Sequence, residues 1–411
     1  MVYNNIVEWN DIRKKGFIYT QNEDKKLSYF IIAYYFTQVL NQTVKNIFPI
    51  PDYLYSKISV IFGLILVFFF LNSITIVLKR SLSIFVFSEL LFISLFLISF
   101  LMGNAEKSVL LYNMVWNLII CVPLGIYIYT ISDLEVFYSA YSKSSFILTA
   151  ILFLILLFSK QERVYNMSYS YALLVPTLFH LNQWFRDKKV LFLIVSLLEI
   201  AGIVLYGSRG PLASLLFFLF LRYLLSEKSL LKKLKVVSSL FILFILYYLF
   251  FEGIGAFVLN YLTEKEYYSR NILLIFTKRI TYDAGRIDIF KYYLGLIKQK
   301  PFIGWGVLGG WISKGLGPHN MIIENLLAFG IIVGGIINIL LIVAQFRIFF
   351  LKNKIICDLL SIYMALCIVL FFIDGYMLTN PSLFLFLGLI LNSFKSNITK
   401  IDIEKGISIK L

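Results

Sequence analysis

The chain has 411 residues, of which 60% are hydrophobic and 18% aromatic, and its mean hydropathy is +0.83. These values lie outside the range of soluble globular proteins and indicate an integral membrane protein. The net charge of +15 is explained by basic cytoplasmic loops, so it does not indicate nucleic acid as a partner.

Apolar runs predict an all-α polytopic membrane protein with about 12 transmembrane helices, because most runs are close to the ~20 residues that a helix needs to cross. Helices 1–9 are expected within residues 27–257, and helices 10–12 within 319–394. The expected spans are 27–48, 58–78, 82–102, 108–130, 144–159, 168–183, 190–207, 211–226, 235–257, 319–345, 355–374 and 380–394.

The positions of Lys and Arg predict the topology, since cytoplasmic loops are enriched in them. With the N-terminus inside, the inner segments hold 23 of the 38 basic residues, the short outer loops hold 6, and segment 258–318 holds the other 9. Both the N-terminal segment 1–26 and the tail 395–411 are therefore expected in the cytoplasm.

Cysteine and histidine are scarce, with three and two residues. Cys121, Cys357 and Cys367 fall inside expected spans, which favours packing over a disulfide framework or a metal site. His180 lies near the cytoplasmic end of the sixth span and is interpreted as an interfacial residue.

The stretch LYGSRGPLAS at 205–214 predicts a tight turn between two spans, because Gly207, Gly210 and Pro211 leave little room for a loop. Arg209 is thereby held near the bilayer. It either pairs with lipid phosphate or, with the N–H groups of the following helix, binds an anionic substrate.

Segment 258–318 is expected to form one long, partly helical extracytoplasmic loop, since ~60 residues exceed an ordinary connection. YLTEKEYYSRNILLIFTKR and GRIDIFKYYLGLIKQK predict helices, and PFIGWGVLGG predicts a turn-rich link. In the second helix, one side is apolar and the other charged; the apolar side holds Ile287, Phe290, Leu294 and Ile297, and the charged side Asp288, Lys291 and Lys298.

Arg286 shares a helical stripe with Phe290 and Tyr293 and is therefore expected to point inward. One reading is a basic side chain that reaches lipid headgroups. The other is an arginine that binds phosphate in a sheltered pocket.

In GPHNMIIENLLAFG, residues 317–330, His319 stands at the start of the tenth span beside Asn320 and Glu324. The spacing of Asn320 and Glu324 allows them to hydrogen-bond each other at the membrane edge. His319 then either acts as a general base on a hydroxyl group or caps the helix.

The order SRG, GRIDIF, KPFIGWG and PHNMIIENLLAFG, over roughly residues 195–345, resembles the O-antigen ligase and polymerase family of bacterial envelope glycosyltransferases. This resemblance implies a multi-pass protein of the bacterial cytoplasmic membrane that needs neither metal nor cofactor. Its substrates would be an undecaprenyl-pyrophosphate-linked oligosaccharide donor and an acceptor. It further implies membrane lipid, a chain-length regulator and a flippase as partners.

The resemblance also implies roles for the residues that match its motifs. Arg209 and Arg286 would hold the pyrophosphate and stabilise its growing negative charge, and His319 would orient or deprotonate the acceptor hydroxyl. The remaining substrate-binding candidates are Lys278, Arg279, Asn320 and Glu324.

Within the family, a polymerase joins lipid-linked repeat units and a ligase moves a glycan to another acceptor. The abundance of Ile, Phe, Lys, Asn and Tyr favours an AT-rich genome, and hence a capsular or exopolysaccharide repeat-unit polymerase. A lipid-linked oligosaccharide flippase or transporter is the alternative from a different class.

Overall fold

The computed structural model describes residues 2–47, 51–158, 167–206, 209–226, 264, 286–309, 317–372 and 377–404. Every regular element in these residues is a helix, as the all-α prediction requires. The elements are α1 (Val2–Ile47), α2 (Asp52–Met102), α3 (Lys107–Trp116), the π-helix η1 (Asn117–Cys121), α4 (Val122–Thr130), α5 (Leu134–Phe158), α6 (Met167–Asp187), α7 (Val190–Tyr206), α8 (Arg209–Leu224), α11 (Arg286–Gln299), α12 (Met321–Phe346), the 3₁₀ turn η2 (Arg347–Phe350), α13 (Lys354–Phe372), the 3₁₀ turn η3 (Met377–Thr379) and α14 (Pro381–Glu404).

Four of the described helical segments are long and apolar enough to cross a membrane: Tyr53–Met102, Lys107–Thr130, Leu134–Leu157 and Met321–Phe350. Shorter apolar helices cover Val190–Leu205, Gly210–Leu224 and Pro381–Lys395. Many large apolar side chains on these helices are exposed, which suits lipid better than water. These features are compatible with a helical membrane protein. The expected span 235–257 and the first helix expected in segment 258–318 lie outside the described residues.

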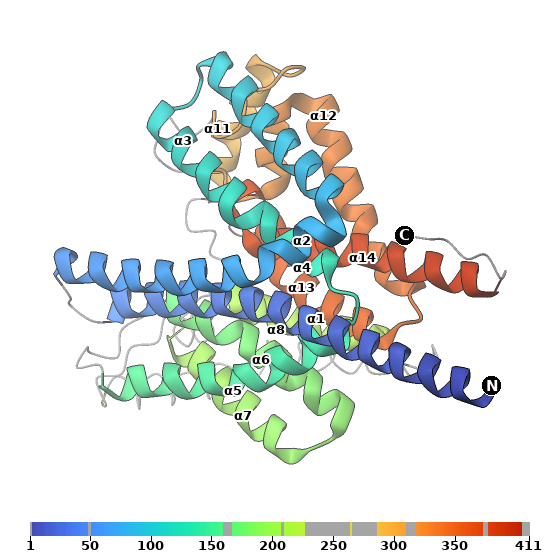
Figure 1. The fold of residues 1–411 in the computed structure, drawn as a ribbon. Helices are drawn as coiled ribbons and strands as arrows, with labels where there is room; N and C mark the ends of the chain where they lie inside the picture. The colour runs from blue at the N-terminus through green and yellow to red at the C-terminus, as the bar shows by residue number, and fades with distance from the viewer. Residues whose placement is uncertain are drawn as a thin grey trace.

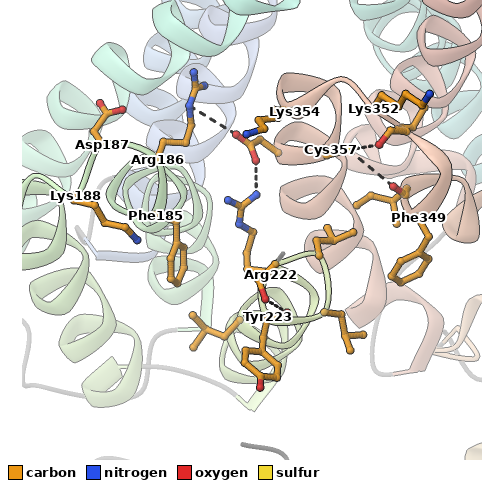
Figure 2. A pocket seen from close by; sticks show the side chains of 17 residues that line it. Phe185, Arg186, Asp187, Lys188, Arg222, Tyr223, Phe349, Lys352, Lys354 and Cys357 are labelled. Carbon is orange, nitrogen blue, oxygen red and sulfur yellow. Dashed lines mark hydrogen bonds and ion pairs between the residues drawn. The ribbon is translucent and has the colours of Figure 1, made fainter. Parts of the chain in front are cut away.

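The main core lies between α1, α4, α5, α6, α13 and α14 (Figure 1). The helices α4 and α14 approach each other closely through glycines: a Cβ on Gly388 would lie 2.1 Å from the carbonyl oxygen of Gly125. Small residues at such a contact let two membrane helices pack backbone to backbone. Next to the core, α8 packs on α13, and Arg222 of α8 pairs with Asp358 of α13 (Figure 2).

One helix, α2, occupies the place of two expected spans. The sequence predicts a short cytoplasmic loop at Lys79 and Arg80, but the helix continues through both and bends at Ser81, where φ is −144° and ψ is 28°. A straight helix of 50 residues would be about 75 Å long, more than twice the thickness of a bilayer core. The bend therefore separates two arms that need not both cross in the same direction.

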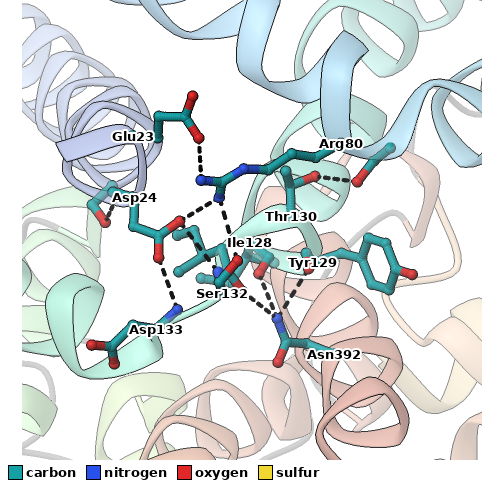
Figure 3. Close-up of polar contacts among 12 residues, drawn as sticks. Glu23, Asp24, Arg80, Ile128, Tyr129, Thr130, Ser132, Asp133 and Asn392 are labelled. Atoms are coloured by element: carbon teal, nitrogen blue, oxygen red, sulfur yellow. Dashed lines mark hydrogen bonds and ion pairs between the residues drawn. The ribbon is translucent and has the colours of Figure 1, made fainter. Parts of the chain in front are cut away.

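A polar cluster explains why the helix does not end at Arg80. The guanidinium pairs with Glu23 and Asp24 of α1, and Asp24 also accepts hydrogen bonds from the backbone of Ser132 and Asp133 (Figure 3). The charge of Arg80 is thus neutralised inside the protein instead of in a loop. Residues 23–24 were expected in the cytoplasmic segment 1–26. They belong instead to α1, which begins at Val2, and the cluster makes them part of the packed structure.

The three cysteines are unpaired, and the buried Cys121 and Cys367 confirm the prediction of packing residues. Cys357 is partly buried and donates weakly to the backbone oxygens of Ile348 and Leu351.

Candidate functional site

Helix α12 folds back on itself at Gly330, within the predicted span 319–345. Gly330 has φ 74° and ψ 174°, which is outside the helical region and open mainly to glycine. Across this break, Asn338 Nδ2 donates a hydrogen bond to the backbone oxygen of Ile322 at 3.1 Å. In a straight helix, residues sixteen positions apart are separated by about 24 Å. The two parts of α12 must therefore lie side by side and run in opposite directions.

We call residues 321–329 the first arm and residues 331–346 the second arm. A buried amide pair joins them, since Asn325 Nδ2 donates to Asn338 Oδ1 at 2.7 Å. A Cβ on Gly334 would lie 2.3 Å from the backbone oxygen of Asn325, so the arms are too close there for any side chain. The first arm is about 13 Å long, less than half of a bilayer core.

The segment that follows α11 is fixed to the tip of this hairpin. Three backbone hydrogen bonds attach it: Trp305 N to Leu327 O at 2.8 Å, Gly306 N to Ala328 O at 2.9 Å, and Ile331 N to Pro301 O at 2.7 Å. Gly304 has φ 74°, and a Cβ there would lie 2.4 Å from the oxygen of Ala328. The glycines of KPFIGWG thus allow the turn-rich link, which the sequence predicted, to lie directly on the hairpin backbone.

Within the stretch GRIDIFKYYLGLIKQK, the predicted helix is present over Arg286–Gln299 as α11, and it packs on the first arm. Tyr293 and Ile297 are buried in one cluster with Leu327. Just beyond the end of each helix, the backbone N–H of Ile331 donates a hydrogen bond to the oxygen of Pro301. The end of α11 and the end of the first arm therefore lie next to each other.

Arg286 is the first residue of α11, and the predicted stripe is present: Arg286 and Phe290 are partly buried and Tyr293 is buried. The wider apolar side was only partly predicted, because Ile287 and Leu294 are 54% and 46% exposed. The contact with the first arm is centred on Tyr293, which turns Ile287 and Leu294 away from the protein.

At the start of the first arm, His319 has a left-handed backbone with φ 49°, which is uncommon for a residue with a side chain. The helix cap is Asn320, whose Oδ1 accepts from the backbone N–H of Ile323 at 3.1 Å. Glu324 Oε2 accepts from the backbone N–H of Met377 at 3.0 Å. The side chains of Asn320 and Glu324 therefore bond to separate backbone groups, so the side-chain hydrogen bond that their spacing allows does not form, although the backbone N–H of Glu324 donates to the backbone oxygen of Asn320.

The structure brings Arg286, His319, Asn320 and Glu324 into one unit of α11 and α12. Arg209 begins α8, which packs mainly on α13 and α6, and its side chain lies outside the described residues. Residues 278 and 279, the other two candidates, also lie outside them.

A second polar site was missed by the sequence prediction. His180 of α6 is fully buried, not interfacial, and its Nδ1 lies 3.0 Å from Glu199 Oε1 of α7. Thr149 of α5 donates a hydrogen bond to the same oxygen. The Nε2 atom of His180 is buried without a hydrogen-bond partner in the described part of the chain, beside the ring of Phe146.

The sequence did contain a signal for this pair. Glu199 lies in the middle of one predicted span, and His180 lies in the span before it. Hydropathy shows that both residues are in or near the membrane, but it does not show that their helices place them face to face.

Among the described residues, no three His, Cys, Asp or Glu side chains gather in a way that could hold a metal ion. Comparisons of the chain with protein-family models, with curated proteins and with solved structures find no match.

Proposed function

We propose that this chain is a membrane glycosyltransferase that polymerises undecaprenyl-pyrophosphate-linked repeat units into capsular, exo- or O-polysaccharide. The reaction would take place at the outer face of a bacterial cytoplasmic membrane. One observation carries the proposal: GRIDIF, KPFIGWG and PHNMIIENLLAFG, which are separate in the sequence, pack into one unit of α11 and the α12 hairpin. Arg286 is the first residue of α11 in this unit, and His319 immediately precedes Asn320, the cap residue of α12.

In the proposed reaction, an acceptor sugar hydroxyl attacks the anomeric carbon of the donor. The bond between this carbon and the pyrophosphate oxygen breaks as the new glycosidic bond forms, and undecaprenyl pyrophosphate leaves. Arg286 and Arg209 stabilise the charge that develops on the pyrophosphate. His319 accepts the proton of the hydroxyl group.

The local geometry of His319 supports this role. The sequence left open whether His319 caps the helix, and Asn320 makes that hydrogen bond instead. A left-handed backbone at a non-glycine residue costs free energy, and such strain is concentrated at functional sites. Asn320 thus provides the helix cap, and the left-handed backbone of His319 supports the proposed chemical role.

The proposal includes a membrane topology of about twelve spans with both termini in the cytoplasm and segment 258–318 outside. Labelling of single cysteines with a membrane-impermeant reagent tests it. In intact cells, a cysteine in place of Ser313 should react and one in place of Ser408 should not. The reverse pattern would place the α11–α12 unit on the wrong side for the proposed reaction.

The deciding experiment incubates the purified protein with a lipid-linked repeat unit and separates the products on a gel. A ladder of products identifies a polymerase. A single shift that requires a second acceptor identifies a ligase. In the same assay, Arg286→Lys and Arg209→Lys should each lose most of the activity, because a point charge does not reproduce bidentate contact with pyrophosphate. Near-normal ladders from both variants would remove the arginines from the site.

Transport of a lipid-linked oligosaccharide is the second candidate, and the buried His180–Glu199 pair favours it. Ionisable residues inside membrane helices often mark proton or substrate pathways. Absence of any product in the gel assay, together with lipid flipping in proteoliposomes that is lost in Glu199→Gln, would favour the transporter. A product ladder from the Glu199→Gln variant would reject it.

A further inference from the structure

A basic pocket lies where the ends of α6 and α8 meet η2 and the start of α13, and its volume is about 1060 Å³. Five basic and two acidic residues line it, which leaves three net positive charges. The basic residues are Arg186, Lys188, Arg222, Lys352 and Lys354, and the acidic residues are Asp187 and Asp358. These basic residues come from three segments that are separate in the sequence: 186–188, 222 and 352–354. The distribution of Lys and Arg predicted all three segments on the cytoplasmic side.

One buried carboxylate orients both arginines of the basic pocket. Arg222 pairs with Asp358 Oδ1, and Arg186 Nε lies 3.8 Å from Asp358 Oδ2. In Figure 2, dashed lines run from Arg186 and from Arg222 to one carboxylate between them. Arg186 is held further by Glu135 at 3.2 Å and by the ring of Tyr138, 4.5 Å from its guanidinium carbon. Within the described residues, Asp358 is the only hydrogen-bond partner of Arg222, so its other N–H donors remain available. Arginines fixed in this way are suited to bind an oxyanion.

Two exposed lysines, Lys188 and Lys352, also line the basic pocket. Lys188 is exposed, and its ammonium lies 5.1 Å from the centre of the Trp184 ring and 5.4 Å from that of Phe185. Lys352 is also exposed and makes no ion pair with a described carboxylate. Flexible ammonium groups at the rim can close on a phosphate that the arginines have bound.

The rim of the basic pocket also carries apolar side chains that face outward. Leu219 of α8 and Phe349 of η2 line it and are 38% and 45% exposed, and the neighbouring Phe350 is 75% exposed. An exposed apolar surface beside a basic cavity fits a ligand with a phosphate head and acyl chains.

We propose that the basic pocket binds a phosphate group, and that an anionic membrane phospholipid supplies it. The arginine pair and the rim lysines bind the phosphate, and the acyl chains lie along the apolar side chains of α8 and η2. This site is separate from the α11–α12 unit, and it would be present whether the chain is a glycosyltransferase or a transporter.

The test measures binding of phosphatidylglycerol and of phosphatidylcholine to the purified full-length protein in detergent, by native mass spectrometry. The double variant Lys188→Gln/Lys352→Gln should bind phosphatidylglycerol roughly thirtyfold more weakly, because each basic residue near an anionic lipid surface raises the affinity about fivefold. The matched control, Lys291→Gln/Lys298→Gln, removes two exposed lysines of α11 and should bind as the wild type does. Equal loss in both double variants, or no loss in either, would overturn the proposal.

A second variant and a second ligand distinguish the source of the phosphate. Arg222→Lys keeps the charge next to Asp358, so the fold should be retained while phosphatidylglycerol binding weakens. Inorganic pyrophosphate should compete poorly with the lipid. Tight pyrophosphate binding without phosphatidylglycerol binding would overturn the lipid assignment, and unchanged lipid binding by Arg222→Lys would remove the arginine from the site.

Discussion

The two histidines of this chain lie in two contrasting regions. His180 is fully buried between α6 and α7 and bonds to Glu199, which in turn accepts from Thr149. His319 lies at the start of the α12 hairpin, partly exposed and in a left-handed backbone. The sequence drew attention to His319 because polar residues surround it, whereas it assigned His180 to the interface because that residue lies near the predicted cytoplasmic end of the sixth span. A hydrogen-bond partner on another helix cannot be predicted from the sequence of one helix alone.

The largest expected effect is the loss of turnover when His319 is replaced. His319→Ala should lower turnover by roughly 10²- to 10⁴-fold, as expected for the loss of a general base. His319→Asn is the matched variant, because asparagine tolerates a left-handed backbone but does not accept the proton. It should be as inactive as His319→Ala. Recovery of activity in His319→Asn would show that the backbone conformation, and not the imidazole, is what matters.

Breaking the buried His180–Glu199 pair should lower the stability of the protein. Glu199→Ala should lower the free energy of unfolding in detergent by about 3 kcal/mol, because it leaves His180 and Thr149 buried without their partner. Glu89→Ala is the control: Glu89 is also expected within a span, but Glu89 Oε1 has no hydrogen-bond partner in the described part of the protein. Equal destabilisation by both variants would mean that Glu199 contributes no more than an unpartnered carboxylate.

The hairpin that presents His319 should depend on Gly330. Gly330→Ala should destabilise the protein by about 2 kcal/mol or more, because φ is 74° and the new Cβ would lie 2.3 Å from the oxygen of Phe302. Gly335→Ala, in the second arm, has nothing within 4 Å of its new Cβ and should be neutral or slightly stabilising. Thermal unfolding of the two variants in detergent provides the measurement. A neutral Gly330→Ala would argue against the fold-back of α12.

The smallest effect is expected for the helix cap beside His319. Asn320→Ala removes the bond to the N–H of Ile323 and should cost about 1 kcal/mol of stability. Asn320→Asp keeps an acceptor at that position and should restore most of it. Activity per folded molecule should change far less than in His319→Ala. A catalytic loss as large as that of His319→Ala would give Asn320 a direct role in binding the substrate.

The sequence predicted local features well. The helix α11, the turn-rich link after it, the inward stripe of Arg286 and the packing role of the buried cysteines are all present. Each of these depends on residues within a few turns of one another, where helical periodicity and glycine or proline content carry the information.

The predictions that failed concern contacts between distant parts of the chain. A loop was expected at Arg80, but carboxylates of α1 neutralise its charge and the helix continues. A side-chain bond was expected between Asn320 and Glu324, but Glu324 reaches the backbone of Met377 instead. In both cases a charged or polar side chain found a partner that is more than fifty residues away.

The sequence by itself determined that this is an apolar, helical chain with a basic bias in particular segments, because long apolar runs favour helices and the positions of Lys and Arg are read directly from it. Only the tertiary structure decided that α12 folds back at Gly330, that His180 meets Glu199, and that three basic segments enclose one pocket around Asp358. The physical reason is that polar groups in a membrane protein must find partners inside the protein. Which partner each one finds depends on how the helices pack, and local sequence does not record that.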